Sequence, residues 1–298
     1  RLKALRAEME KRGITVYVVP TADFHESEYV GDHFKARKFI TGFTGSAGTA
    51  VITLDEAGLW TDGRYFVQAE NQLKDSTVTL YRMGEEGVPT VDEFVKDRLK
   101  EGGCLGFDGR VVNGTWGGKL EKIAAEKNVS MHVTEDLIDL IWEDRPALSK
   151  QPLFILEEKY SGKSTADKIA DLRKAMKENG ADVHILTSLY DIAWLLNIRG
   201  NDIDYVPVVL SYLVLNETEC IWFLQEEVVD DKIRAYLEEN HITTKPYDAI
   251  YDYVPEIPAD AVVLMNRGTV NYRIVNSLDK AIKVVDKPNP TELMKAVK

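Results

Sequence analysis

The chain contains near its start the stretch Leu5-Arg6-Ala7-Glu8-Met9-Glu10-Lys11-Arg12-Gly13, and this stretch decides the fold because its pattern recurs as Leu172-Arg173-Lys174-Ala175-Met176-Lys177-Glu178-Asn179-Gly180. In both copies leucine and methionine repeat at helical spacing and a glycine is a suitable helix stop. A strand-like run follows each glycine, and the first run, residues 14–19, ends at Pro20. The separation between the copies is that of domains rather than of short repeats. The sequence therefore predicts two related domains.

Helices and strands alternate through the rest of both halves, which favours two α/β domains of similar design over one large sheet. In the first half we expect a helix that starts at a capping box of Thr90 and Glu93 and runs through residue 99. The other expected elements are strands at 104–107 and 129–133 and a helix at 116–126 in the first half, and helices near 248–254 and 272–278 and strands at 261–265 and 282–285 in the second.

Two polar stretches that contain proline mark the boundary between the halves. They are Glu143-Asp144-Arg145-Pro146 and Ser149-Lys150-Gln151-Pro152, and such stretches are typical of linkers. We place the domains at residues 1–148 and 149–288. Limited proteolysis at 144–151 is then expected to leave two stable pieces.

A further helix start is predicted at Asn289-Pro290-Thr291-Glu292, with asparagine as N-cap, proline at N1 and glutamate at N3. The printed sequence stops soon afterwards. We therefore expect this helix to have nothing to pack against, and we assign residues 289–298 to the start of a further domain.

Composition excludes several classes of protein. The 37 basic and 49 acidic residues leave a net charge of -12, which repels a nucleic acid backbone. The longest stretch without a charged residue, 39–54, is too short to span a membrane. The two cysteines, Cys104 and Cys220, form neither a disulfide ladder nor a metal-ligand pair, so a reducing, cytoplasmic location is expected.

The sequence lacks the usual hydrolase and nucleotide-binding motifs, including the phosphate loop, the G-x-S-x-G elbow and H-E-x-x-H. His132 and His184 lie in strand-like runs and are expected to be structural. Three glycines at 42, 45 and 48 precede a strand. They could present backbone N–H groups to an anion, but close packing of two backbone segments is the favoured interpretation.

Arg64 is the first candidate for function. We expect it in the first turn of a helix that Asp62 caps, where a guanidinium opposes the helix dipole and therefore suggests a substrate or partner. A second group, Arg199, Asn201 and Asp202, lies between an apolar helix and an apolar strand. Its members form either a local ion pair that orders the loop or part of a domain interface.

The ordered set of motifs resembles the long, three-domain Xaa-Pro aminopeptidases (aminopeptidase P, peptidase family M24 of the creatinase and prolidase superfamily). These motifs are Asp23-Phe24-His25-Glu26-Ser27-Glu28-Tyr29, the glycine stretch 41–50, Trp60-Thr61-Asp62-Gly63-Arg64-Tyr65-Phe66, Ile141-Trp142-Glu143-Asp144-Arg145-Pro146 and the segment 191–207. The resemblance covers essentially the whole chain, in the same order.

The resemblance implies two creatinase N-terminal-like domains of ribonuclease H-like α/β fold, each a mixed sheet flanked by helices. In that family a C-terminal pita-bread domain follows and binds two divalent metals, commonly manganese, through two Asp, one His and two Glu. None of those ligand motifs occurs in these 298 residues. The chain is thus expected to be the front part of the enzyme, inactive alone, with no catalytic or metal-binding residue of its own.

The whole protein would remove the first residue from peptides with proline in second place. The resemblance places Arg64 in the motif that faces the substrate, and Asp62, His25, Arg199 and Asp202 are candidates for the cleft or an interface. The implied partners are the peptide substrate, the catalytic domain of the same protein and a second copy in a homodimer.

Two alternatives differ from this interpretation. Creatinase and prolidase share the downstream fold but typically carry one front domain, so the duplication argues against both. Histone-chaperone relatives keep the architecture without the metals, and they make a non-enzymatic peptide- or protein-binding module the second hypothesis. Metal ligands downstream would distinguish an enzyme from a binding module.

Overall fold

The computed structural model describes residues 1–297, and these residues form two units. The first unit contains Arg1–Phe24 and Asp32–Ala147, and the second contains His25–Gly31 and Leu148 onwards. Each unit has its own sheet and its own hydrophobic core.

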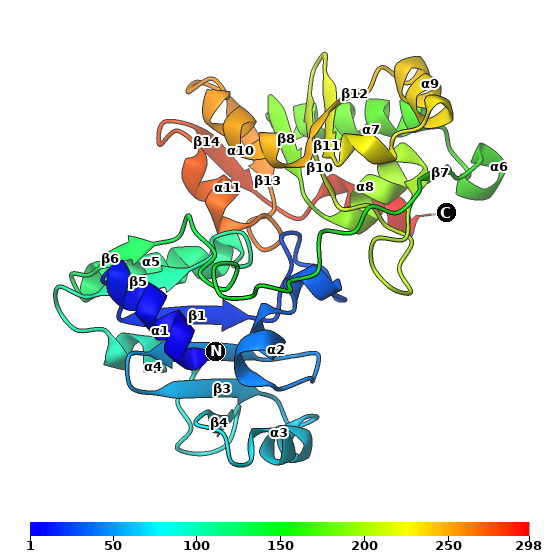
Figure 1. Cartoon of the computed structure of the whole chain (residues 1–298). Coiled ribbons are helices and arrows are strands. Elements are labelled where there is room, and N and C mark those ends of the chain that lie inside the picture. Colours follow the sequence, from blue (N-terminus) through cyan, green and yellow to red (C-terminus); the bar gives the residue numbers. More distant parts are fainter. Residues whose placement is uncertain (298) are drawn as a thin grey trace. The chain divides into compact units, whose positions relative to one another are not determined.

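The first unit is built around a six-stranded sheet in the order β4-β3-β2-β1-β5-β6 (Figure 1). Its elements are α1 (Leu2–Lys11), β1 (Val16–Pro20), α2 (Ala36–Thr41), β2 (Thr49–Thr53), β3 (Ala57–Thr61), α3 (Phe66–Leu73), β4 (Thr79–Arg82), α4 (Val91–Arg98), β5 (Cys104–Phe107), α5 (Gly114–Glu126) and β6 (Ser130–His132). β2 is antiparallel to both neighbours, and the other pairs are parallel.

Helices cover both faces of this sheet. Tyr17 and Val19 of β1 lie in a core cluster with Leu5 of α1 and Ala69 of α3. Because side chains alternate along a strand, the other face of the sheet needs a second cover. α4 supplies it, since its Phe94 contacts the Trp60 indole of β3 with ring centroids 4.8 Å apart, and α5 lies against α4.

The second unit repeats this topology in the order β12-β11-β10-β8-β13-β14. Its elements are β7 (Phe154–Ile155), α6 (Glu158–Ser161), α7 (Thr165–Glu178), β8 (Val183–Leu186), α8 (Leu189–Leu196), β9 (Ile198–Arg199), β10 (Ser211–Asn216), β11 (Cys220–Leu224), α9 (Asp231–Glu239), β12 (Thr243–Pro246), α10 (Ile250–Tyr253), β13 (Val262–Met265), α11 (Tyr272–Ser277), β14 (Lys283–Asp286) and α12 (Pro290–Ala296). Gly13 and Gly180, which end the repeated helix, both have positive φ, so the predicted duplication is confirmed.

Both six-stranded sheets are therefore mixed and flanked by helices, as predicted for the fold class. In the second unit α7, α8 and α9 supply Leu172, Leu195 and Ile233 to one core cluster with Leu213 of β10. α10 packs on the opposite face, where Tyr253 contacts the β11 residue Phe223 with ring centroids 5.6 Å apart.

A short segment of the first half folds within the second unit. His25–Gly31 is assigned to that unit, and the His25 side chain is 2% exposed. A contiguous division at residue 148 would instead place residues 25–31 in the first domain. A single cut at 144–151 would leave residues 25–31 on the first piece, and the proteolysis result stays a prediction.

The last helix also differs from expectation. α12 begins at Pro290 after Asn289, whose backbone N–H donates to Glu292 Oε1, as the capping pattern predicted. It does not lack a packing partner, however. Lys295 forms an ion pair with the buried carboxylate of Asp191 in α8, and Asn289 Nδ2 donates to the same carboxylate at 3.3 Å. The helix is therefore attached to the second unit.

Candidate functional site

The strand directions place several polar groups at one edge of the first sheet. β1, β3, β4, β5 and β6 run the same way, because β2 is antiparallel to both β1 and β3. Their carboxyl ends meet at one edge, where open α/β sheets generally bind ligands. The turn after β3 and the turn after β5 both lie at this edge.

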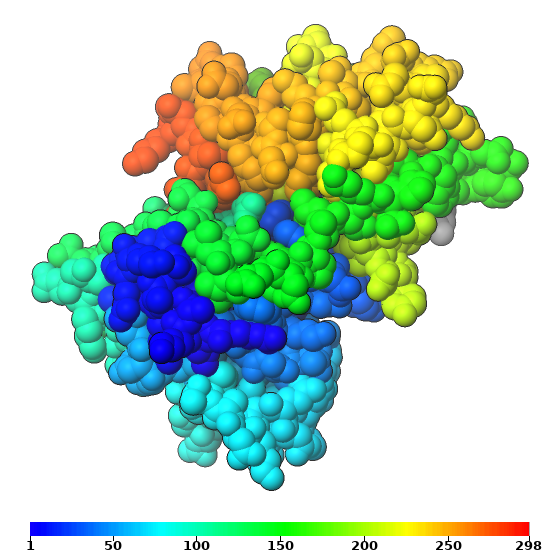
Figure 2. Space-filling model, viewed as in Figure 1, coloured from blue at the N-terminus to red at the C-terminus, as the bar shows by residue number. Residues whose placement is uncertain are grey.

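The turn after β3 holds Arg64 in a chelate with Asp62. Arg64 Nε donates to Asp62 Oδ1 at 2.8 Å and Nη2 donates to Oδ2 at 2.9 Å. These hydrogen bonds lower the pKa of Asp62 to about 2. The Arg64 side chain remains 69% exposed, and α3 with β4, cyan in Figure 2, forms an exposed part of the surface of this unit.

The helix expected at Arg64 starts later than predicted. α3 begins at Phe66 with Tyr65 as N-cap, and no side chain caps it. Asp62 is bonded to Arg64 instead of capping the helix, because a local Asp-Gly-Arg chelate satisfies the carboxylate first. Arg64 therefore lies before the helix and does not oppose its dipole, and its exposure and its chelation by Asp62 are what distinguish it.

The glycine stretch packs beneath this turn. A Cβ at Gly45 would lie 2.2 Å from the Phe43 ring and 2.8 Å from the Tyr65 ring. At Gly48, φ is +156°, and a Cβ would lie 2.8 Å from the carbonyl of Trp60. Close packing against another backbone segment is thus confirmed at Gly48, and aromatic rings leave no room for a side chain at Gly45. Gly42 differs, because it ends α2 with a φ of +80° and has no atom within 4 Å of a Cβ placed there. The buried Arg37 donates to the carbonyls of Phe43 and Gly45 and orders the same loop.

The turn after β5 has the same sequence and the same chelate. In Asp108-Gly109-Arg110, Arg110 Nε donates to Asp108 Oδ1 and Nη2 donates to Oδ2, each at 3.0 Å. Here the aspartate is buried and the guanidinium stands over the Phe24 ring, 4.4 Å from its centroid. The repeated Asp-Gly-Arg tripeptide is the sequence signal of this second turn.

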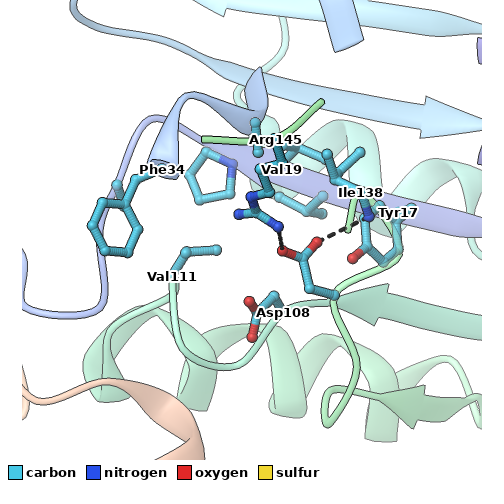
Figure 3. Close-up of a pocket in the computed structure, with 12 residues that line it drawn as sticks. Tyr17, Val19, Phe34, Asp108, Val111, Ile138 and Arg145 are labelled. Carbon is cyan, nitrogen blue, oxygen red and sulfur yellow. Dashed lines mark hydrogen bonds and ion pairs between the residues drawn. The ribbon is translucent and has the colours of Figure 1, made fainter. Parts of the chain in front are cut away.

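Asp108 also lines a small internal cavity at the carboxyl edge (Figure 3). The cavity measures about 10 Å³, which is room for about one water molecule. Arg145 closes it and donates from Nη1 to Asp136 Oδ2 at 2.6 Å and from Nε to the His33 carbonyl at 2.9 Å. Arg145 and Asp136 are each 7% exposed in their side chains.

This cluster gathers two carboxylates and two guanidinium groups around Tyr17. Burial raises the pKa of Asp136 and the charge of Asp108 raises it further, while Arg145 opposes both effects. Burial also raises the pKa of Tyr17, whose hydroxyl accepts a hydrogen bond from the Leu137 backbone at 3.0 Å. The cavity is too small to hold a peptide. We therefore interpret the cluster as one that stabilises the carboxyl edge of the sheet.

His25 belongs to a buried aromatic group in the second unit. Its Nδ1 lies 3.1 Å from the Thr187 carbonyl, which can only accept, so Nδ1 is the donor. Its Nε2 lies 2.6 Å from the Tyr247 hydroxyl, and its ring lies over Tyr212 with centroids 4.5 Å apart. At 2% exposure His25 supports the core and offers no surface to a substrate.

Arg199 and Asp202 are not bonded to each other in residues 1–297, so of the two alternatives for this group the local ion pair is wrong. Asp202 instead accepts from the backbone N–H groups of Gln151 at 3.1 Å and Leu210 at 2.9 Å, and burial raises its pKa. Arg199 lies in β9 and donates to the carbonyls of Ala193 and Ile198. Backbone groups that the sequence pattern does not reveal are the partners of both side chains.

The two histidines that lie in strands, His132 and His184, differ in burial. His184 is fully buried, and its Nδ1 lies 2.9 Å from the Leu264 carbonyl, which fits the structural role expected of it. His132 is partly exposed and lies 3.1 Å from Glu135.

The second unit contains a buried lysine that the sequence pattern does not reveal. Lys168 in α7 is 1% exposed and donates to the Trp194 carbonyl at 2.8 Å and to Asn197 Oδ1 at 2.6 Å. It caps the carboxyl end of α8, where unpaired carbonyls need donors. Burial lowers its pKa to about 8, and the charges of Arg199 and Lys163 add to that effect. A lone lysine on an amphipathic helix gave no signal of this role.

The shifted pKa of Lys168 predicts a pH-dependent stability. Because the folded state holds this proton less tightly than the unfolded chain, the cost of burying the charge is present below pH 8 and is relieved as the pH rises towards 10.5. We expect the free energy of unfolding of the wild type, relative to the Lys168→Met variant, to rise between pH 8 and 10. Urea titrations at several pH values measure this difference. A difference that stays constant with pH would contradict the assignment.

Neither a metal centre nor a membrane span is found in the part of the chain that the structure describes. Within residues 1–297, no group of three or more His, Cys, Asp or Glu side chains could hold a metal ion. No helix among these residues is long and apolar enough to cross a membrane.

Comparison with known proteins places both halves in one family. Residues 1–141 and 144–298 each match a model described as the creatinase/prolidase N-terminal domain. A probable Xaa-Pro aminopeptidase P of Sordaria macrospora is 42% identical over 289 residues, which are 95% of this chain and 47% of that protein. Aminopeptidase P2 of Arabidopsis thaliana is 37% identical, over 90% of this chain and 38% of its own length.

A solved structure extends the likeness to three dimensions. The X-prolyl aminopeptidase of Caenorhabditis elegans, described as a cytosolic enzyme with a di-nuclear active site, aligns with a TM-score of 0.89 and 32% identity. The alignment covers 96% of this chain and 47% of that one. The chain thus spans less than half the length of these relatives.

Proposed function

The chain belongs to the creatinase/prolidase N-terminal domain family and carries two of its domains, and from this premise we propose that it is the non-catalytic front part of an Xaa-Pro aminopeptidase. The observation that carries the proposal is the match to aminopeptidase P relatives across both domains, at 42% identity over 95% of the chain for the Sordaria protein. The substrate would be a peptide with proline in second place. Proline lacks an N–H and has a fixed φ, so this bond needs a dedicated enzyme.

The chemistry would come from two divalent metal ions held by residues outside this chain. The di-nuclear site of the nematode relative supports this division of labour. Such a centre supplies a metal-bound hydroxide and polarises the scissile carbonyl. We take manganese as the metal to test first, and we propose a cytosolic homodimer whose catalytic domain follows these two.

Within that enzyme, the first unit would contribute Arg64 to substrate binding. The support is physical: the guanidinium is 69% exposed at the carboxyl edge of the sheet, yet its orientation is fixed by Asp62. A donor that is both accessible and oriented suits a peptide carbonyl or carboxylate. His25, Arg199 and Asp202 are bound to groups of the second unit, and we propose no substrate contact for them.

Replacing Arg64 by alanine is expected to lower kcat/KM of the full-length enzyme about ten- to a hundredfold, the loss typical of a charged hydrogen bond to substrate. The substrate for the assay is an Arg-Pro-Pro peptide. The melting temperature should change little, since an exposed ion pair contributes little to stability. Unchanged kcat/KM would remove the substrate contact from the proposal.

A non-enzymatic binding module of the same fold is the second candidate. The two are separated by titrating the full-length protein with Mn²⁺ and assaying the same peptide. Metal binding with hydrolysis supports the aminopeptidase. Peptide binding without metal or hydrolysis would support the binding module instead.

A further inference from the structure

The Arg64 guanidinium is bonded along one edge only. Its side edge, formed by Nε and Nη2, donates to the two oxygens of Asp62 at 2.8 and 2.9 Å, and the Arg64 backbone N–H donates to Oδ1 at 3.1 Å. A guanidinium has a second fork at its end, formed by Nη1 and Nη2. Within residues 1–297, Nη1 makes no hydrogen bond. The end edge therefore remains available at an exposed position.

The chelate is a property of the Asp-Gly-Arg sequence rather than of one side-chain placement. Asp108-Gly109-Arg110 forms the same three hydrogen bonds, all at 3.0 Å, after another strand of the same sheet. One copy is buried and the other is exposed. Because the same geometry forms in two different surroundings, its cause is local to the turn.

A rigid ring supports the guanidinium from a second direction. The Arg64 guanidinium carbon lies 5.2 Å from the centroid of the Tyr65 ring, within the range of a cation–π contact. The Tyr65 hydroxyl is in turn bonded to Ser46 Oγ at 2.6 Å, and its ring packs edge-on against Phe43. The platform under Arg64 is thus fixed by the glycine-containing loop.

From this geometry we propose that Asp62 is a positioning residue for the substrate contact: it holds Arg64 by the side edge and presents the end edge to a carbonyl or carboxylate oxygen of the peptide. The inference rests on the proposed function of Arg64. Asp62 itself does not touch the substrate. Without this chelate, the arginine side chain would lose conformational freedom when it binds the substrate, and this loss of entropy would lower the affinity.

A double-mutant cycle in the full-length enzyme tests the proposal. We expect Asp62→Ala to lower kcat/KM for the Arg-Pro-Pro peptide about 3- to 10-fold. In the Arg64→Ala background the same substitution should change kcat/KM by less than about twofold, because Asp62 acts only through Arg64. Additive losses would overturn the proposal. If Arg64→Ala alone has no effect, the substrate contact fails, which is a separate result from failure of Asp62.

Two further measurements exclude a general structural effect. Asp55 is an exposed aspartate in the turn between β2 and β3, at the opposite edge of the sheet, where it accepts from Thr53 Oγ1 at 2.8 Å. The matched Asp55→Ala variant should keep wild-type kcat/KM.

The second measurement is NMR of the 298-residue chain. The Nε–H signal of Arg64 should be protected from exchange with water, and it should lose that protection in the Asp62→Ala variant. An unprotected signal in the wild type would overturn the chelate itself.

Discussion

Replacing Arg145 by alanine is expected to lower the free energy of unfolding of the first unit by about 3 to 5 kcal/mol, the cost of leaving a buried carboxylate without its cation. Arg145 is bonded to Asp136 at 2.6 Å and to Asp139 at 3.0 Å. Asp136 also faces Asp108, so removing the cation leaves two acids close together in a buried cluster. Urea unfolding of the 298-residue chain, together with hydrogen exchange of the β1 and β5 amides, measures this loss of stability.

The loss should shrink as the pH falls, because a protonated Asp136 needs no cation. The matched control is Arg82→Ala in the same unit, whose arginine pairs with Glu70 at 3.1 Å and is 38% exposed. An exposed pair of this kind contributes about 0 to 1 kcal/mol. A loss for Arg145→Ala that is no larger than this control would contradict the role given to the buried pair.

Replacing His25 by alanine is expected to destabilise the second unit by about 3 to 5 kcal/mol, although residue 25 belongs to the first half of the sequence. The substitution removes a buried ring that contacts Tyr212 and leaves the Tyr247 hydroxyl and the Thr187 carbonyl without this partner. Hydrogen exchange followed by mass spectrometry separates the two units. Amides of β8, β10 and β13 should exchange faster, and those of β1 and β2 should keep their protection.

His132→Ala is the control for this experiment. His132 lies in β6 of the first unit, is partly exposed and has Glu135 as its partner at 3.1 Å. Its loss should cost at most about 1 kcal/mol and should act on the first unit. Faster exchange of β1 and β2 in His25→Ala, instead of β8 and β10, would show that residues 25–31 stabilise the first unit.

Local rules were sufficient for most of the secondary structure. The capping box of Thr90 and Glu93 starts α4, the strand predicted at 104–107 is β5, and Gly13 ends the first helix with positive φ. These features depend on neighbours within a few residues, so the sequence pattern contains their causes. The repeated helix, turn and strand also predicted two domains, and the two sheets share one strand order.

The candidate site was predictable only in part. Arg64 was singled out because a guanidinium in the first turn of a helix opposes the dipole and because its motif resembles that of the family. The first ground fails, since α3 begins only at Phe66, whereas the chelate with Asp62 is local to the turn. The start of α3 was misplaced by the expectation that Asp62 caps the helix. A carboxylate can bond either to a backbone N–H or to the adjacent guanidinium, and pattern alone does not say which partner it takes.

Contacts between distant segments were decided by the tertiary structure. Arg145 meets Asp136 and the His33 carbonyl, His25 meets Thr187 and Tyr247, and Lys168 meets the carboxyl end of α8. In each case a buried polar group needs a partner, and the nearest suitable donor or acceptor lies on another element. Periodicity predicts which side of an element is buried, but it does not specify which polar group lies opposite. Only the folded sheets and the helices on their faces bring those pairs together.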